Sequence, residues 1–190
     1  MRKIIITLVS LLITTHAFAD LSLDNDASHF FFLSTKNNKV TETHHFKALQ
    51  GSISKTGSAS LTIDLSSVET NIPIRNERML KFLFNVEKYP TAAVTVNFDN
   101  ALLSELVAGS VINQTFDAEI TLHGVTKTLA TPLTVTKLSS GAITVTNQTP
   151  IIINATEFAL DTGIEELQKI AKLDAIAITV PVSFQLTYLP

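Results

Sequence analysis

The side chains of this chain that could do chemistry are few and far apart. His44 and His45 are adjacent, with His29 upstream, and histidines are common ligands of transition metals. Adjacent residues of a strand point to opposite sides of a sheet, so His44 and His45 cannot easily bind one metal ion together. We therefore interpret these histidines as surface or mouth-lining residues. The chain has no cysteine and no His-Glu-x-x-His motif, so the sequence predicts no metal site.

Arg75 and Arg78 form a second candidate group, with Glu77 between them. The two guanidinium groups could form a basic rim that meets a polar headgroup such as a pyrophosphate. They could also fix a short helix to the rest of the fold through an ion pair or a backbone contact. The sequence leaves both interpretations open.

No group of residues forms a catalytic site. Asp117 and Glu119 alternate with apolar residues, which is typical of the solvent face of a half-exposed strand. His123 precedes Gly124 in a short turn, where we expect the imidazole to bond a nearby backbone group. The chain has neither a Gly-rich phosphate loop nor a Gly-x-Ser-x-Gly nucleophile motif. The sequence therefore predicts a protein that is not an enzyme and has no covalent cofactor.

Residues 1–19 have the pattern of a secretory signal peptide. Arg2 and Lys3 are followed by an apolar run of about ten residues, and Ala17-Phe18-Ala19 provides a small-x-small cleavage signal. The apolar run is too short to span a bilayer core of about 30 Å, which argues against a membrane anchor. We expect cleavage after Ala19, one domain over residues 20–190, and a periplasmic protein without stable membrane insertion.

The composition of the mature chain excludes several partners. Removing Arg2 and Lys3 from the 14 Lys and Arg residues leaves 12, against 17 Asp and Glu residues, a net charge of −5. Nucleic acids and anionic membrane surfaces require a basic face, so neither is an expected partner. Because the chain has no cysteine, no disulfide supports the domain and its own core must stabilise it.

Apolar and polar residues alternate with a period of two through most of the chain, which predicts antiparallel strands. The clearest alternating runs are 60–68, 92–98, 115–122 and 175–189. Short polar turns are expected at 36–39, 55–58 and 139–141. Two stretches have helical spacing instead, and they are 75–84 and 161–173. In the second of these, Thr162 and Glu165 have the spacing of a capping box.

The strands must close or stack to bury their apolar faces. A sandwich and a barrel both fit the pattern, but roughly eight strands favour a closed barrel, which has no exposed edges. We therefore predict an all-β fold, an eight-stranded antiparallel barrel with one or two short helices. The inward apolar stripes could fill a solid core or line a cavity, and the pattern does not distinguish between these.

Six stretches carry a resemblance that spans nearly all of the mature chain. In order they are 28–36, 45–53, 66–79, 83–96, 116–129 and 180–186. The most specific motifs are the Lys88-Tyr89-Pro90 turn and the turn His123-Gly124-Val125-Thr126-Lys127. On these residues the chain resembles the YceI-like family of secreted bacterial proteins. Many members carry Arg-Asp-x-His-Leu where this chain has Arg75-Asn76-Glu77-Arg78-Met79, so no role of that histidine is carried over.

The resemblance implies a lipocalin-like barrel with a long apolar cavity for an isoprenoid tail, such as that of a quinone or a polyprenyl carrier. It implies a periplasmic carrier with such a lipid as its partner and bound, non-covalent cofactor. Family members are often paired, which leaves a homodimer open. The alternatives are a stress-related structural or interaction protein with a filled barrel, and an enzyme that acts on such a lipid. The expected cavity-lining residues are Phe30, Phe32, Phe46, Val94, Val96, Phe98, Phe116, Ile120, Leu122 and Phe184.

Overall fold

The computed structural model describes residues 20–190, and the predicted signal peptide lies outside the described residues. The strands are β1 (Leu21–Leu23), β2 (His29–Lys36), β3 (Val40–Phe46), β4 (Leu49–Ser54), β5 (Ser58–Asp64), β6 (Val68–Glu69), β7 (Thr91–Asn97), β8 (Val111–Leu122), β9 (Val125–Lys137), β10 (Ile143–Asn147), β11 (Ile151–Asn154) and β12 (Thr179–Leu189). The helices are α1 (Pro73–Arg78), α2 (Ala101–Glu105) and α3 (Asp161–Ala171), with the 3₁₀ turns η1 (Leu65–Ser67) and η3 (Ala155–Phe158) and the π-helical segment η2 (Met79–Phe84).

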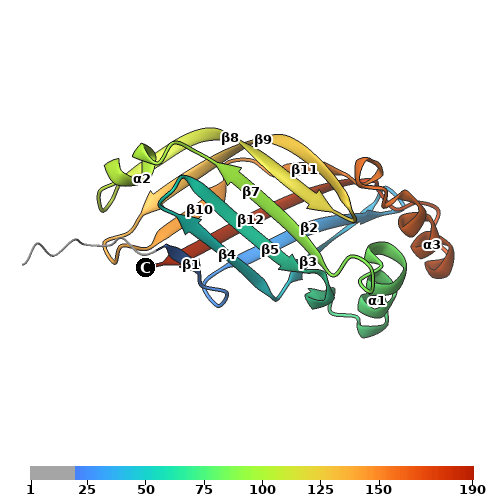
Figure 1. Cartoon of the computed structure of the whole chain (residues 1–190). Helices are drawn as coiled ribbons and strands as arrows, with labels where there is room; N and C mark the ends of the chain where they lie inside the picture. The colour runs from blue at the N-terminus through green and yellow to red at the C-terminus, as the bar shows by residue number, and fades with distance from the viewer. Residues whose placement is uncertain (1–19) are drawn as a thin grey trace, which may run out of the picture.

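The twelve strand segments form eight antiparallel strands that follow one another in chain order. β1 and β2 both pair with the same edge of β12, and β10 and β11 both pair with its other edge. On the next strand along, β4 pairs with β1 and β3 pairs with β2. On the strand after that, β5 pairs with β4 and β6 pairs with β3. β7, β8 and β9 complete the circuit, and the β1–β12 pairing closes it. The predicted eight-stranded antiparallel barrel is therefore confirmed (Figure 1).

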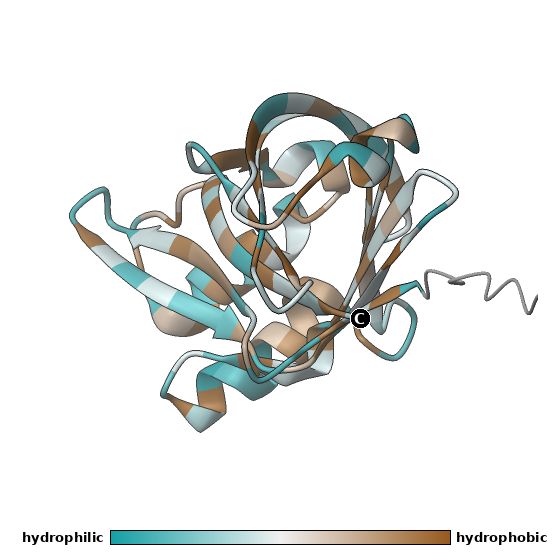
Figure 2. Cartoon of the chain, turned by 90° about the vertical axis from the view of Figure 1, so that its left-hand side faces the viewer, coloured by the Kyte–Doolittle hydropathy of each residue, from teal (hydrophilic) through white to brown (hydrophobic). Residues whose placement is uncertain are grey.

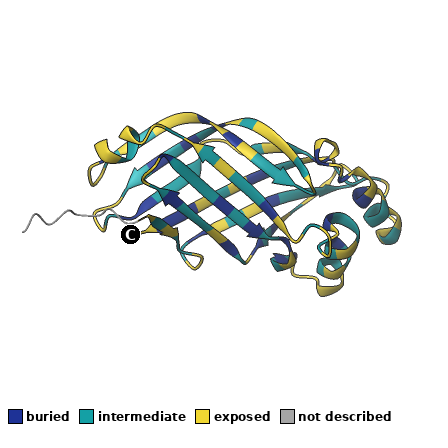
Figure 3. Cartoon of the chain, in the orientation of Figure 1, coloured by how far each residue is buried: buried dark blue, intermediate teal, exposed yellow. Residues whose placement is uncertain are grey.

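Closure of the sheet gives every strand one face toward the axis. Seen along the axis, the ribbons form a ring in which hydrophilic and hydrophobic positions alternate (Figure 2). Burial also alternates along the strands (Figure 3), because side chains of a strand point to opposite faces in turn. No helix among residues 20–190 combines the length and the apolar character needed to cross a membrane.

Two of the predicted strands are shorter than their alternating sequence suggests. The run 60–68 leaves the sheet after Asp64, because the Asp64 carboxylate accepts a hydrogen bond from the Ser66 backbone N–H at 2.8 Å and turns the chain into η1. The run 175–189 joins the sheet only at Thr179. Its first residues are held by the β2–β3 turn, where the Asn37 backbone N–H donates to the Ala175 carbonyl at 2.8 Å.

His123 and Gly124 form the two-residue turn between β8 and β9. Their φ angles are 52° and 79°, and two successive positive φ angles are typical of tight hairpin turns. The His123 ring packs against the Tyr89 ring with centroids 4.5 Å apart, and its Nδ1 has no hydrogen-bond partner among the described residues. The expected bond from this imidazole to a backbone group is therefore wrong. The two family-like turns, at 88–90 and 123–127, contact each other instead.

We expect Gly124→Ala to destabilise the protein more than Gly109→Ala. Both glycines have positive φ, which costs an L-residue about 1–2 kcal/mol. A Cβ at Gly124 would lie 2.8 Å from the Tyr89 ring, whereas a Cβ at Gly109 would meet nothing within 4 Å. Urea unfolding of the two variants measures the difference, and equal losses would show that the Tyr89 contact contributes nothing.

The helices lie at the two ends of the barrel, with α1 and α3 at one end and α2 at the other (Figure 1). The stretch 75–84 is helical as predicted, divided between α1 and η2. The stretch 161–173 forms α3, which packs against η2, but its predicted capping box is wrong. The residue before α3 is Leu160, which makes no side-chain cap, because the chain enters the helix from η3 with Leu160 N–H bonded to the Ala155 carbonyl at 3.1 Å.

Candidate binding cavity

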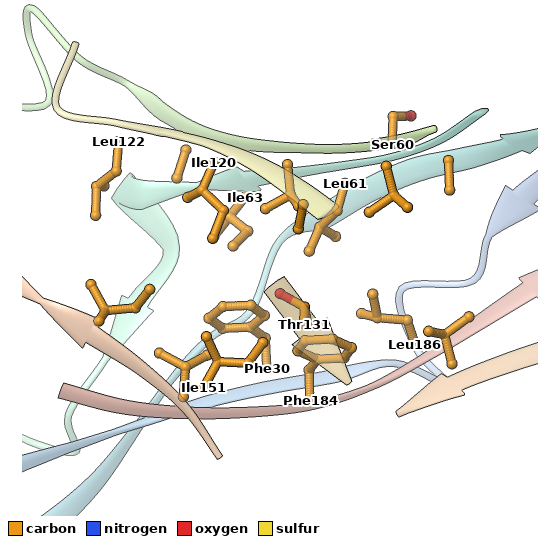
Figure 4. A pocket seen from close by; sticks show the side chains of 18 of the residues that line it. Phe30, Ser60, Leu61, Ile63, Ile120, Leu122, Thr131, Ile151, Phe184 and Leu186 are labelled. Carbon is orange, nitrogen blue, oxygen red and sulfur yellow. The ribbon is translucent and has the colours of Figure 1, made fainter. Parts of the chain in front are cut away.

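The barrel encloses an apolar cavity of about 240 Å³. It extends along the barrel, from Leu102 and Leu103 of α2 at one end to Leu83 of η2 and Ile164 of α3 at the other. Between these ends the wall consists of inward-facing strand residues, several of which converge on the interior from opposite sides in Figure 4. Apolar cavities of about 150 Å³ already take up molecules such as benzene, so this space is large enough for part of a ligand.

The structure places all ten residues of the predicted lining on the wall of this cavity. The phenylalanines among them form an ordered group. The rings of Phe30 and Phe184 are stacked with centroids 6.1 Å apart and an angle of 7° between them, and Phe46 meets the edge of Phe30 at the same distance. Stacked and edge-to-face contacts between aromatic rings are favourable, so these rings stabilise one another in this part of the wall.

Sequence reasoning missed wall residues of two kinds. Leu133, Leu186 and other strand residues share the alternation of the predicted set, so the same pattern could have found them. Leu83 and Ile164 come from η2 and α3, and no pattern in the sequence indicates that these segments cover one end of the barrel. Their position is a property of the tertiary structure alone.

The described wall contains no charged side chain, and its polar members are Ser60, Thr131 and Tyr188. The Thr131 hydroxyl donates to the Leu129 carbonyl at 3.1 Å. The Tyr188 hydroxyl donates to the Ser60 carbonyl at 3.4 Å, and burial raises the pKa of this phenol above its ordinary value. Tyr188 is therefore neutral, and the interior offers hydrogen bonds at very few places.

Arg75 and Arg78 do not line the cavity. Arg75 donates from Nη1 to Glu42 Oε2 at 2.7 Å and from Nη2 to the Thr70 carbonyl at 2.6 Å. Lys36 also pairs with Glu42 at 2.6 Å. These bonds tie α1 to the β2–β3 hairpin, which supports the structural interpretation of Arg75. Arg78 is half-buried and makes no ion pair within residues 20–190.

Two carboxylates near α1, those of Glu42 and Glu69, have pKa values below their ordinary ones. The hydrogen bond from Lys36, with the nearby Arg75 charge, holds the pKa of Glu42 below its ordinary value in spite of partial desolvation. Bonds from Lys47, Asn76 and the Asn71 backbone lower the pKa of Glu69 to about 2. A carboxylate with a lowered folded-state pKa stabilises the fold above the unfolded-state pKa, and this contribution is lost as the pH falls through the folded-state pKa.

We therefore expect the free energy of unfolding to fall as the pH is lowered from about 5 toward 2, and Glu42→Gln to show a shallower decline. Urea unfolding at a series of pH values measures this. Glu157→Gln, which removes an exposed carboxylate, is the matched control and should follow the original chain. An identical pH profile for Glu42→Gln and the original chain would contradict the role of Glu42.

His44 and His45 both lie in β3 but are buried to different extents. His44 and His45 face opposite sides of β3 as expected, but His44 is only 2% exposed, so its interpretation as a surface or mouth residue is wrong. Its ring meets the Phe32 ring edge-on at 5.4 Å, and burial lowers the pKa of this imidazole. Among residues 20–190, no three His, Asp or Glu side chains lie close enough to hold a metal ion.

A closed up-and-down barrel around an apolar cavity defines a class of small barrels whose interior can hold one ligand. A profile of the YceI-like domain matches residues 21–188, so the chain belongs to the YceI-like family and the resemblance seen in the sequence is confirmed. A search of curated proteins finds no significant match.

Fifteen chains of solved structures match this chain, including the following two. A polyisoprenoid binding domain from Saccharophagus degradans implicated in plant cell wall breakdown is 44% identical, with 89% of this chain and 97% of that chain covered and a TM-score of 0.86. Burkholderia cenocepacia BcnA is 22% identical, with 87% and 98% covered and a TM-score of 0.67. The second likeness shows that the fold is shared.

Proposed function

We propose that this protein is a periplasmic carrier of an isoprenoid lipid of the quinone or polyprenyl type, whose tail occupies the cavity. The observation that most strongly supports this proposal is the largely apolar wall of the cavity, which has no charged side chain among the described lining residues. The name of the Saccharophagus degradans relative, a polyisoprenoid binding domain, supports the same ligand. Binding is a transfer of apolar surface out of water, worth about 0.8 kcal/mol for each CH₂ group, and needs no covalent step.

The cost of the cavity also supports a ligand. At about 24 cal/mol for each Å³, a void of this volume with nothing in it would destabilise the fold by about 6 kcal/mol. That is comparable with the whole stability of an ordinary domain, about 5–15 kcal/mol, and this chain has no disulfide to compensate. A ligand that restores the missing contacts would remove most of this cost.

Organic extraction of the freshly purified mature protein, followed by mass spectrometry, tests the proposal. We expect an isoprenoid lipid in the extract and a matching mass difference between native and denatured protein. Native protein at its bare polypeptide mass, with no lipid in the extract and no uptake of added isoprenoid quinone, would contradict the carrier function.

We expect removal of the lipid to lower the melting temperature. A ligand present at about 100 times its dissociation constant stabilises the folded state by roughly 2.7 kcal/mol, which is several degrees for a domain of this size. Differential scanning calorimetry before and after delipidation measures the shift, and re-addition of the extracted lipid should restore it. A melting temperature that does not depend on lipid would show that the cavity is not the binding site.

The two alternatives are less well supported. A filled barrel would have no interior space, whereas this one has a cavity. An enzyme acting on the lipid needs convergent titratable groups at the reacting centre, and Tyr188 is the one ionisable residue in the described lining.

A further inference from the structure

Gly51, Ser60 and Tyr188 meet on the inner surface of the barrel, on the neighbouring strands β4 and β5 and on β12. Gly51 lies opposite Leu61 in the β4–β5 ladder and shares a face with Leu49 and Ile53, both buried in the core. A Cβ at Gly51 would lie 2.3 Å from the Ser60 carbonyl oxygen. Only glycine at this position therefore leaves room for that carbonyl on the inner surface.

The Ser60 side chain points away from the cavity (Figure 4), and its Oγ lies 3.2 Å from Ser52 Oγ. Ser60 therefore contributes its backbone, not its hydroxyl, to the wall. Tyr188 reaches across from β12 and places its hydroxyl 3.4 Å from this carbonyl. The result is one donor and one acceptor, side by side, in a wall whose other polar member among the described residues is Thr131.

The bond between these two groups is long. Hydroxyl donors normally lie about 2.5–3.0 Å from an oxygen acceptor, so the 3.4 Å contact leaves the Tyr188 hydroxyl poorly satisfied. Tyr188 is only 3% exposed, so water cannot readily complete its hydrogen bonds. By contrast, the Thr131 hydroxyl already has a backbone acceptor at 3.1 Å. Among the hydroxyls of the described wall, that of Tyr188 is therefore the one best able to form a new hydrogen bond with a ligand.

The lack of charged side chains in the described wall limits which ligand groups the Tyr188 hydroxyl and the Ser60 carbonyl can bind. No cation lies among the described lining residues, and a phosphate moved into such surroundings without a partner would carry a large desolvation cost. An uncharged oxygen has no such cost. A hydroxyl can accept from Tyr188 and donate to the Ser60 carbonyl, and a carbonyl can accept from Tyr188 alone.

We propose that the Tyr188 hydroxyl and the Ser60 carbonyl form a polar anchor that binds an uncharged oxygen of the lipid and selects neutral isoprenoid alcohols or carbonyl compounds over phosphorylated ones. This inference rests on the proposed carrier function. Tyr188 pairs with Leu23 of β1 and Ile143 of β10, near the chain terminus at the α2 end of the barrel (Figure 1). The oxygen is therefore held at that end, and the tail extends toward η2 and α3.

Three probes with the same C15 tail test the anchor: farnesene, farnesol and farnesyl diphosphate. Each is titrated into delipidated protein by calorimetry. We expect farnesol to bind about 3–10 times more tightly than farnesene, the ordinary gain from one hydrogen bond, and farnesyl diphosphate to bind more weakly than farnesol. In Tyr188→Phe, which keeps the ring, the preference for farnesol over farnesene should disappear. Thr131→Val removes a different wall hydroxyl and should retain the preference.

The tyrosine itself gives a second measurement that does not depend on a binding-site variant. The chain has two tyrosines, Tyr89 and Tyr188, and no tryptophan. In Tyr89→Phe, the near-ultraviolet absorption reports Tyr188 alone. We expect farnesol to shift this absorption more than farnesene does, because only farnesol forms a hydrogen bond with the phenol.

The outcomes separate this inference from the carrier function. If none of the probes binds, both are wrong. If farnesene and farnesol bind equally, or if Tyr188→Phe keeps the preference for farnesol, the carrier function stands and the anchor is wrong. Tight binding of farnesyl diphosphate would likewise overturn the proposed selection against charge while leaving the carrier function intact.

Discussion

Replacement of Phe116 by aspartate is expected to abolish lipid retention and to lower the free energy of unfolding by about 4–5 kcal/mol. Phe116 is 7% exposed and its ring lines the cavity. Removal of a buried phenylalanine costs roughly 3–5 kcal/mol, and a carboxylate at the same place would be desolvated without a partner. Urea unfolding measures the first effect, and the lipid that co-purifies with each mole of folded protein measures the second.

Thr115→Asp is the matched control, because Thr115 is the exposed neighbour of Phe116 on β8 and points to solvent. It should keep both stability and lipid. Phe98→Asp provides a second cavity variant, at a half-buried residue that is more tolerant of substitution. A folded Phe98→Asp or Phe116→Asp protein that retains its full complement of lipid would remove these side chains from the binding site.

Ala118→Phe is expected to reduce lipid capture at least 10-fold while the fold survives. Ala118 is 3% exposed, lies on the wall of the cavity, and faces the same interior as Phe116 and Ile120. A phenyl ring at this position would occupy space that the tail needs. Its fit into an existing cavity should limit the change in stability to about 1–3 kcal/mol in either direction. Binding of an isoprenoid quinone to delipidated protein, followed by calorimetry, checks the effect.

Ala130→Phe makes the same substitution on the opposite face of the sheet. Ala130 is exposed on β9 and pairs with Asp117, the residue next to Ala118, so the control differs mainly in the direction of the side chain. It should bind lipid as the original chain does. Equal binding by Ala118→Phe and Ala130→Phe would mean that the tail does not enter the barrel.

The direction of the strand side chains could be predicted from the sequence with good success. Val94, Val96 and Phe98 were assigned to one face by alternation alone, and all of them line the cavity. This works because the side-chain period of a strand is two, whatever the strand pairs with. Short runs of polar turn residues, another local signal, located the turns at 36–39 and 55–58; β3 begins directly after the first, and β5 begins at the last residue of the second.

Predictions that needed a particular side-chain partner were less successful. His123 was expected to bond a backbone group and packs on Tyr89 instead. Thr162 was expected to cap α3, but the chain enters that helix from η3. His44 was placed at the surface and is buried against Phe32. The contacts of His123 and His44 depend on residues of other elements, so no local pattern carries the information.

The sequence by itself determined the fold class, the family and the inward face of each strand, because these follow from alternation and from motifs that are local in the chain. Only the tertiary structure decided that the inward side chains leave a cavity, that η2 and α3 cover one end of it, and that Arg75 pairs with Glu42. The volume left inside a barrel depends on how all its strands close around one axis. The contact of Tyr188 with the Ser60 carbonyl depends on the same closure, since β12, the last strand, comes beside β1 and near β4 and β5 only when the barrel closes.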